Sequence, residues 1–155
     1  MSDKNSPRSN GVDEIMSRCV DDLLIAKRIN VMSVDSYRSD LCGSEYPLQV
    51  SARLLKAGTE VLPHFHNKFK RVTKSTVECW VVFSGSIESE IYDVDQNYLS
   101  TIQVGSGDCL ILFAGGHSLR TTDTDTVFFE FKNGPYLGSD RDKTIIDRDE
   151  CIKNQ

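Results

Sequence analysis

The sequence predicts an all-β domain, either a sandwich or a small barrel, preceded by an amphipathic helix. From Gln49 onward, apolar and polar residues alternate with a period of two, which is typical of strands that bury one face. Turn-forming residues divide this region into about eight short runs, and no helical period occurs among them. Short antiparallel strands of this kind bury their faces and edges by forming a sandwich or a small barrel.

The first part of the chain has a different pattern. Residues 1–11 are polar and turn-rich and are expected to form a disordered tail. Residues 12–47 are expected to hold the amphipathic helix and a connector, with Asp13 and Glu14 near the positive end of the helix. The apolar positions that recur every three to four residues are Ile15, Met16, Cys19, Val20, Leu23 and Leu24.

Residues 48–138 are expected to form the β domain. Pro63 suggests that its run lies at a sheet edge or a barrel rim, because proline cannot donate to a strand ladder. Residues 139–155 form a polar C-terminal extension. The expected strands are residues 49–55, 60–66, 78–84, 86–94, 99–104, 109–113, 117–121 and 126–132.

Length and charge limit the function classes. A chain of 155 residues suits one domain with one core. The net charge of −5 argues against binding to nucleic acid or to an anionic membrane. No apolar run approaches the ~20 residues that span a bilayer. The N-terminus lacks the apolar core of a signal peptide, so a cytoplasmic location is expected.

The five cysteines are odd in number and widely spaced, without a C-x-x-C pair. A disulfide framework and a thiolate zinc site are therefore not expected. Cys79 and Cys109 lie in apolar runs and are interpreted as small buried hydrophobic residues.

All three histidines lie near strand ends. His64 and His66 are two residues apart, so on a strand both rings point to the same face. Glu78 begins the next apolar run, and His117 follows a glycine turn. Three imidazoles and one carboxylate suit a divalent transition metal such as Fe, Mn, Ni or Zn. Taken singly, each residue is also compatible with a surface hydrogen-bonding role.

The segment from Gly58 to Gly85 resembles the first motif of the cupin superfamily. Five residues separate Gly58 from the H-x-H pair, and six separate Glu78 from Gly85. The segment from Gly107 to His117 is similar to the second cupin motif. The resemblance covers roughly residues 48–132 and implies a jelly-roll barrel, the double-stranded β-helix, with one divalent metal bound by His64, His66, Glu78 and His117.

The chain departs from the cupin pattern in three places. Eleven residues separate His66 from Glu78, where the family has three or four. Phe113 stands where proline is common, and one residue is missing between Gly115 and His117.

The end of the β region resembles a smaller group. The stretch FFEFKNGPYLGSDRDK is similar to the end of the small WbuC-type cupins of bacterial surface-polysaccharide biosynthesis, with Gly134, Pro135, Tyr136 and Lys143 at the matching positions. This resemblance implies a setting in lipopolysaccharide or surface-sugar metabolism.

Several residues are candidates for binding a substrate. Lys70 and Arg71 belong to a basic stretch between the expected metal ligands, which either attracts an anionic substrate or is simply a solvated loop. Arg53 lies on the preceding run and can point inward or outward. Trp80 and Tyr92 either line a sugar site or pack in the core. Arg120 replaces an asparagine that is frequent in the second cupin motif.

Several functions fit this pattern. The first is a metal-dependent enzyme, of the isomerase, epimerase or hydrolase type, acting on a small anionic or sugar-related molecule; an Fe(II) dioxygenase is an alternative. The second is a non-catalytic cupin that binds a metal or a sugar as a sensor or accessory subunit. The third is a structural module. A homodimer is expected for all of them.

Overall fold

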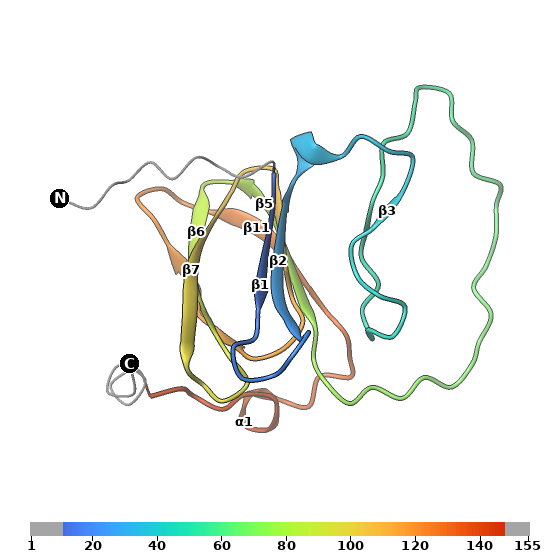
Figure 1. Cartoon of the computed structure of the whole chain (residues 1–155). Helices are drawn as coiled ribbons and strands as arrows, with labels where there is room; N and C mark the ends of the chain where they lie inside the picture. The colour runs from blue at the N-terminus through green and yellow to red at the C-terminus, as the bar shows by residue number, and fades with distance from the viewer. Residues whose placement is uncertain (1–10, 148–155) are drawn as a thin grey trace.

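The computed structural model describes residues 11–147 and shows an all-β fold, which confirms that prediction. Two antiparallel sheets lie face to face, and a third, two-stranded sheet lies to one side (Figure 1). The described strands do not join into a closed barrel. No helix among residues 11–147 is long and apolar enough to cross a membrane.

The larger sheet contains five strands in the order β1-β2-β8-β5-β11. Its strands are β1 (Val12–Met16), β2 (Leu24–Asn30), β8 (Asp108–Leu112), β5 (Glu78–Ser84) and β11 (Val127–Lys132). β11 pairs only with β5 and therefore forms one edge of this sheet.

The second sheet is built on β6, which pairs with β7, β9 and β10. Its strands are β6 (Ser86–Tyr92), β7 (Tyr98–Gly105), β9 (Gly116–His117) and β10 (Arg120–Thr121). The remaining elements are β3 (Ser39–Asp40), β4 (Ser51–Ala52), the 3-10 turn η1 (Val31–Ser33) and the short helix α1 (Ser139–Asp142).

The main core lies between the two sheets. Trp80 and Val82 of β5 belong to it, and they pack with residues of β6, β7 and β8 such as Ile91, Val104 and Leu110. All five side chains are at most 1% exposed. Burying a large apolar side chain contributes roughly 1.5–3 kcal/mol, so this cluster supplies much of the stability of the fold.

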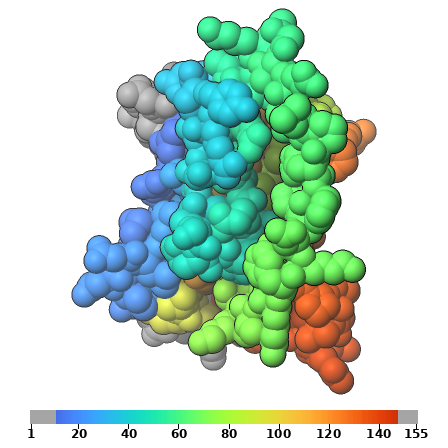
Figure 2. Space-filling model, turned by 90° about the vertical axis from the view of Figure 1, so that its right-hand side faces the viewer, coloured from blue at the N-terminus to red at the C-terminus, as the bar shows by residue number. Residues whose placement is uncertain are grey.

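The other face of the large sheet carries a second apolar cluster. Cys79 of β5 and Ile111 of β8 point to this face, because side chains alternate along a strand. Leu41, Tyr46 and Leu48 lie on residues 34–54, here called the covering segment, and pack over that face. Figure 2 shows the covering segment, in cyan to teal, at the centre of this side of the molecule.

The expected N-terminal helix is wrong: residues 12–30 form the antiparallel hairpin β1–β2. Residues 17–23 form its turn, with Asp22 at a positive φ of 57° that no helix accommodates. Ser17 Oγ donates to Asp93 at 2.7 Å and the Arg18 amide donates to it at 2.6 Å, so tertiary hydrogen bonds hold the turn. The expected disordered tail lies, apart from Gly11, outside the described residues, as do residues 148–155 of the expected C-terminal extension.

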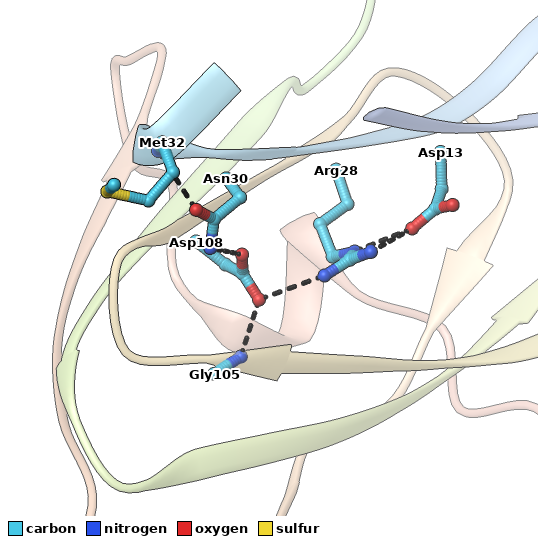
Figure 3. Close-up of polar contacts among 6 residues, drawn as sticks. All are labelled: Asp13, Arg28, Asn30, Met32, Gly105 and Asp108. Atoms are coloured by element: carbon cyan, nitrogen blue, oxygen red, sulfur yellow. Dashed lines mark hydrogen bonds and ion pairs between the residues drawn. The ribbon is translucent and has the colours of Figure 1, made fainter. Parts of the chain in front are cut away.

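A buried ion-pair network attaches this hairpin to the sheet (Figure 3). Arg28 of β2 is 7% exposed, and its guanidinium donates to Asp13 at 2.7 Å and to Asp108 at 3.1 Å. Asp108 also accepts from Asn30 at 2.7 Å and from the Gly105 amide at 2.8 Å. Burial opposes the charge of Arg28, but the two aspartates outweigh it and raise the pKa of Arg28.

The other expected strands are found in most cases. The structure has β5, β6, β7, β8 and β11 where the alternation predicts strands. Residues 117–121 are divided into the short β9 and β10. Residues 49–55 contain only the two-residue β4, and residues 60–66 pair with no other strand in the described chain. Instead, residues 59–74, here called the extended segment, are exposed along their length and loop away from the sheets (Figure 1).

Candidate functional site

A pocket of about 410 Å³, lined by both polar and apolar side chains, lies at one end of the two sheets. The short helix α1 and the chain after it pass this end (Figure 1). Both sheets contribute to its walls, β5 and β11 from one side and β6 and β9 from the other. Its lining includes Thr76, Glu78, Tyr92, Leu112, Ala114, Gly115, Gly116, His117, Ser118, Lys132 and residues 142–146.

Strand register explains how the charged side chains of the pocket meet. Glu78 is the first residue of β5 and is paired directly with Lys132, the last residue of β11. His117 lies on β9, where it pairs with Ile91 of the opposite sheet. Residues that are distant in sequence therefore converge at one end of the fold.

Glu78 lies between an imidazole and an ammonium group. Its side chain is buried, with one oxygen 3.2 Å from Nε2 of His117 and the other 3.6 Å from Nζ of Lys132. The hydrogen bond with His117 lowers the pKa of Glu78, and the charges of Lys132 and Lys143 act in the same direction against the effect of burial. The carboxylate form is therefore favoured in the pocket.

Trp80 supports this arrangement from the core. It is 1% exposed and packs edge-on against the His117 ring with 5.2 Å between ring centroids. Its indole Nε1 has no hydrogen-bond partner within residues 11–147. Trp80 is therefore a core residue that positions His117, and it is not among the residues lining the pocket.

The structure brings together two of the four expected metal ligands. Glu78 and His117 are in contact, but His64 and His66 lie on the exposed extended segment and are not part of the pocket lining. Their rings lie edge-on to each other with 5.4 Å between ring centroids, and Nδ1 of His64 is 2.9 Å from the carbonyl oxygen of Leu62. As arranged, this donor set does not fit a four-ligand metal site, because the pocket holds two donors and Lys132 already pairs with one of them.

The expected substrate-binding residues are dispersed. Tyr92 lines the pocket, and its hydroxyl donates to Glu90 at 2.7 Å. Arg53 borders a groove on the outer face of the large sheet instead. Lys70 and Arg71 are exposed on the extended segment, where Arg71 lies over the Phe69 ring. Arg120 is 73% exposed and pairs with Glu88 of β6.

Neither pocket lysine, Lys132 or Lys143, is predicted as a site residue from the sequence, although Lys143 lies at one of the positions that resemble the WbuC-type ending. Lys132 ends a mostly apolar strand, and its role follows only from the pairing of β11 with β5. Lys143 follows α1, in a stretch whose polarity resembles that of any surface segment.

One group of three potential metal-ligating atoms occurs in the described chain: Cys19, Asp93 and Asp95. Cys19 and Asp95 are exposed. Asp93 is 2% exposed, and its carboxylate accepts hydrogen bonds from Ser17, the Arg18 amide and the Val94 amide. These hydrogen bonds explain the role of Asp93: its carboxylate holds the β1–β2 turn in place.

No protein-family model matches this chain, and neither curated proteins nor solved structures give a match. The functional argument therefore rests on the geometry of the pocket.

Proposed function

We propose that this chain is a cupin-type jelly-roll protein that binds a small anionic, sugar-related molecule in the pocket around Glu78 and His117, and that it acts there as an isomerase or epimerase. The proposal rests on one observation: at the end of the fold, the Glu78 carboxylate lies 3.2 Å from the His117 ring nitrogen and 3.6 Å from the Lys132 ammonium. The resemblance to small cupins of surface-polysaccharide biosynthesis suggests the sugar class.

The pocket has the size and polarity for such a ligand. Its volume of about 410 Å³ lies within the range of small-molecule sites. Its charged groups include two lysines, Lys132 and Lys143, and two carboxylates, Glu78 and Asp142. Ammonium groups bind a phosphate or carboxylate, whereas carboxylates accept hydrogen bonds from sugar hydroxyls. A polyhydroxylated molecule with one anionic group can therefore bind to the ammonium groups and to the carboxylates of the pocket at the same time.

The Glu78–His117 pair supplies groups for moving a proton. A carboxylate and an imidazole at 3.2 Å are within hydrogen-bond reach of each other, and general acid–base catalysis uses these groups most often. Glu78 is favoured as a carboxylate, which can accept a proton from carbon next to a carbonyl, and His117 stands beside it to exchange protons.

Binding is tested by thermal unfolding with sugar phosphates, nucleotide sugars and the matching neutral sugars. A ligand at a hundredfold excess over its Kd stabilises by about 2.7 kcal/mol, which raises Tm by roughly 5–10 °C for a chain of this size. We expect Lys132→Met to abolish the shift and Lys70→Met, on the extended segment, to preserve it. The opposite result places anion binding on the extended segment and contradicts the pocket.

Catalysis is tested by exchange of substrate protons in D₂O, followed by NMR. An isomerase or epimerase that moves a proton incorporates deuterium next to the carbonyl, and Glu78→Gln stops this incorporation. Binding without any exchange or conversion in the wild type identifies a non-catalytic sensor or accessory subunit.

A second candidate is the metal-binding cupin with His64, His66, Glu78 and His117 as ligands. The contact between Glu78 and His117 favours it, since these two come from separate motifs. The extended segment would have to carry both remaining histidines to the pocket. Elemental analysis of untagged protein tests this: stoichiometric Fe, Mn, Ni or Zn that is lost in both His64→Ala and His117→Ala supports it. Metal-free protein after supplementation with each ion contradicts it.

The expected homodimer is also part of the proposal. β11 is an edge strand, and its outward side chains Val127, Phe129 and Phe131 are 61%, 59% and 49% exposed. An antiparallel pair of β11 strands centred on Phe129 sets Val127 against Phe131 of the partner subunit and places no like charges opposite each other. The edge is therefore complementary to a second copy of itself.

A further inference from the structure

Two thiols face each other on neighbouring strands of the large sheet. Cys79 lies on β5 and Cys109 on β8, one diagonal step apart, since the register pairs Cys79 with Ile111 and Val81 with Cys109. Their sulfur atoms are 3.4 Å apart, so the side chains are in direct contact without a bond. A bond requires the sulfurs to approach by about 1.4 Å, to the S–S length of about 2.05 Å.

Both thiols border a groove of about 570 Å³ between the covering segment and the outer face of the large sheet. Cys79 is 3% exposed, whereas Cys109 is half-buried. Apolar residues such as Val81, Leu48 and Phe131 make up much of the rest of the lining. A molecule the size of hydrogen peroxide reaches Cys109 first, through this groove.

The thiol–thiol hydrogen bond makes the two cysteines unequal. The contact and burial raise the pKa of Cys79, whereas the contact lowers the pKa of Cys109. Either sulfur can donate in this contact. The nucleophile in thiol oxidation is a thiolate that the oxidant can reach, and Cys109 is the more exposed of the two. Cys109 is therefore assigned as the reacting sulfur and Cys79 as the resolving one.

We propose that Cys79 and Cys109 form a reversible dithiol–disulfide site whose oxidant is hydrogen peroxide. Cys109 sulfur attacks a peroxide oxygen, the O–O bond breaks, and the products are a sulfenic acid on Cys109 and water. Cys79 sulfur then attacks the Cys109 sulfur, the S–O bond breaks, and a second water leaves with the thiol proton. The two sulfurs lose two electrons in all, and the peroxide is reduced to two waters; a dithiol reductant reverses the change.

The sequence offers a direct test with the full-length protein. Residues 75–120 contain no lysine or arginine before Arg120, so trypsin releases Cys79 and Cys109 in one peptide with no other cysteine. After hydrogen peroxide treatment, thiol blocking and digestion without reductant, we expect this peptide to carry no blocking group and to be lighter by two hydrogen atoms. Cleavage after Glu88 and Glu90 then leaves its two halves joined until dithiothreitol is added.

Single variants separate the roles of the two sulfurs. Cys79→Ala should accumulate a sulfenic acid on Cys109 that dimedone traps, whereas Cys109→Ala should leave Cys79 unmodified at the same peroxide dose. Cys42→Ala is the matched control, because Cys42 lies on the covering segment over the same face and should not affect the bond. A wild-type peptide in which both cysteines remain blocked, or in which one is oxidised without loss of the other thiol, overturns the proposal even if a variant fails to fold.

Discussion

At the scale of single residues, the structure depends on a few buried charges whose partners are far away in sequence. Arg28 joins Asp13 and Asp108, and Asp93 holds the turn between β1 and β2. Buried charges are costly without partners, so each of these residues is expected to have a larger effect when changed than an exposed charge of the same type.

Arg28→Leu should lower the free energy of unfolding by about 3–5 kcal/mol, because it leaves the 3%-exposed Asp108 without its cation. Arg38→Leu is the matched control. Arg38 pairs with Asp40 at 2.7 Å, but both side chains are about half exposed, and such pairs contribute less than about 1 kcal/mol. Chemical denaturation measures the free energy of unfolding of both variants. Equal decreases in the two variants would show that burial does not determine how much these ion pairs contribute to stability.

Asp93 should make stability depend on acid pH. Burial favours its neutral form, but the hydrogen bonds from Ser17 and from the Arg18 and Val94 amides outweigh this and lower the pKa of Asp93 to about 2. The folded pKa is below the ordinary value of 3.8, so the stabilisation is complete above that pH and disappears as pH falls toward 2.

The difference in stability between wild type and Asp93→Asn should therefore be large at pH 7 and should shrink between pH 4 and about pH 2. Denaturation midpoints across this range measure it. Asp21→Asn, at an exposed position in the same turn, should show little difference from wild type at any pH. A constant Asp93 difference down to pH 2 would argue against the ionised carboxylate as the group that holds the turn.

At the scale of elements, the sequence predicts those strands that can be recognised from the pattern of apolar residues within the strand alone. Trp80 and Val82 of β5 face the main core while Cys79 faces the covering segment, so this strand is apolar on both faces and easily recognised. The β1–β2 hairpin is different. Its apolar residues at 15–16, 19–20 and 23–24 mimic a helical period, and the hydrogen bonds to Asp93 that select the turn come from 70 residues or more further along the chain.

The residues of the candidate site also divide into those that local sequence patterns identify and those that only the strand pairing reveals. Glu78 and His117 are identified by spacing within motifs, and the structure brings them together. Lys132 is recognisable only from strand pairing, which local patterns do not specify. The alternation at residues 60–66 predicts a strand, but a strand also needs a neighbour, and residues 60–66 have none in the described chain.

Among residues 11–147, the extended segment should be the first part that trypsin cuts. Lys68, Lys70, Arg71 and Lys74 are exposed there, and residues 59–74 contribute no strand pairing. Lys27 and Arg28, within β2, should be cut only after global unfolding. Mass spectrometry of early digests gives the order in which these sites are cut.

The same digestion tests the metal-binding candidate. Protection of the extended segment by added Zn²⁺ that is lost in His117→Ala would support that candidate, and unchanged cleavage would count against it.

At the scale of the whole molecule, the large sheet is covered unequally. The covering segment packs over β2, β5 and β8, while the row of aromatic side chains at the β11 edge remains open. Phe83 of β5 extends this row; it is 57% exposed and packs edge-on against Phe129 at 5.0 Å. An open strand edge beside an exposed apolar row favours association with another chain.

Phe129→Glu should therefore convert the proposed homodimer into a monomer. In the pairing centred on Phe129, the substitution places two carboxylates opposite each other and removes the central aromatic contact, which should cost about 2 kcal/mol or more and raise the dimer Kd roughly 30-fold. Light scattering during size-exclusion chromatography over a range of concentrations measures it, against a subunit mass of 17.4 kDa. Met32→Glu, at a residue that is 90% exposed and remote from β11 in the sheet order, should leave the dimer intact. A wild-type protein that stays monomeric at every concentration would mean that the β11 edge does not join two copies, and the pocket would then have to function within one chain.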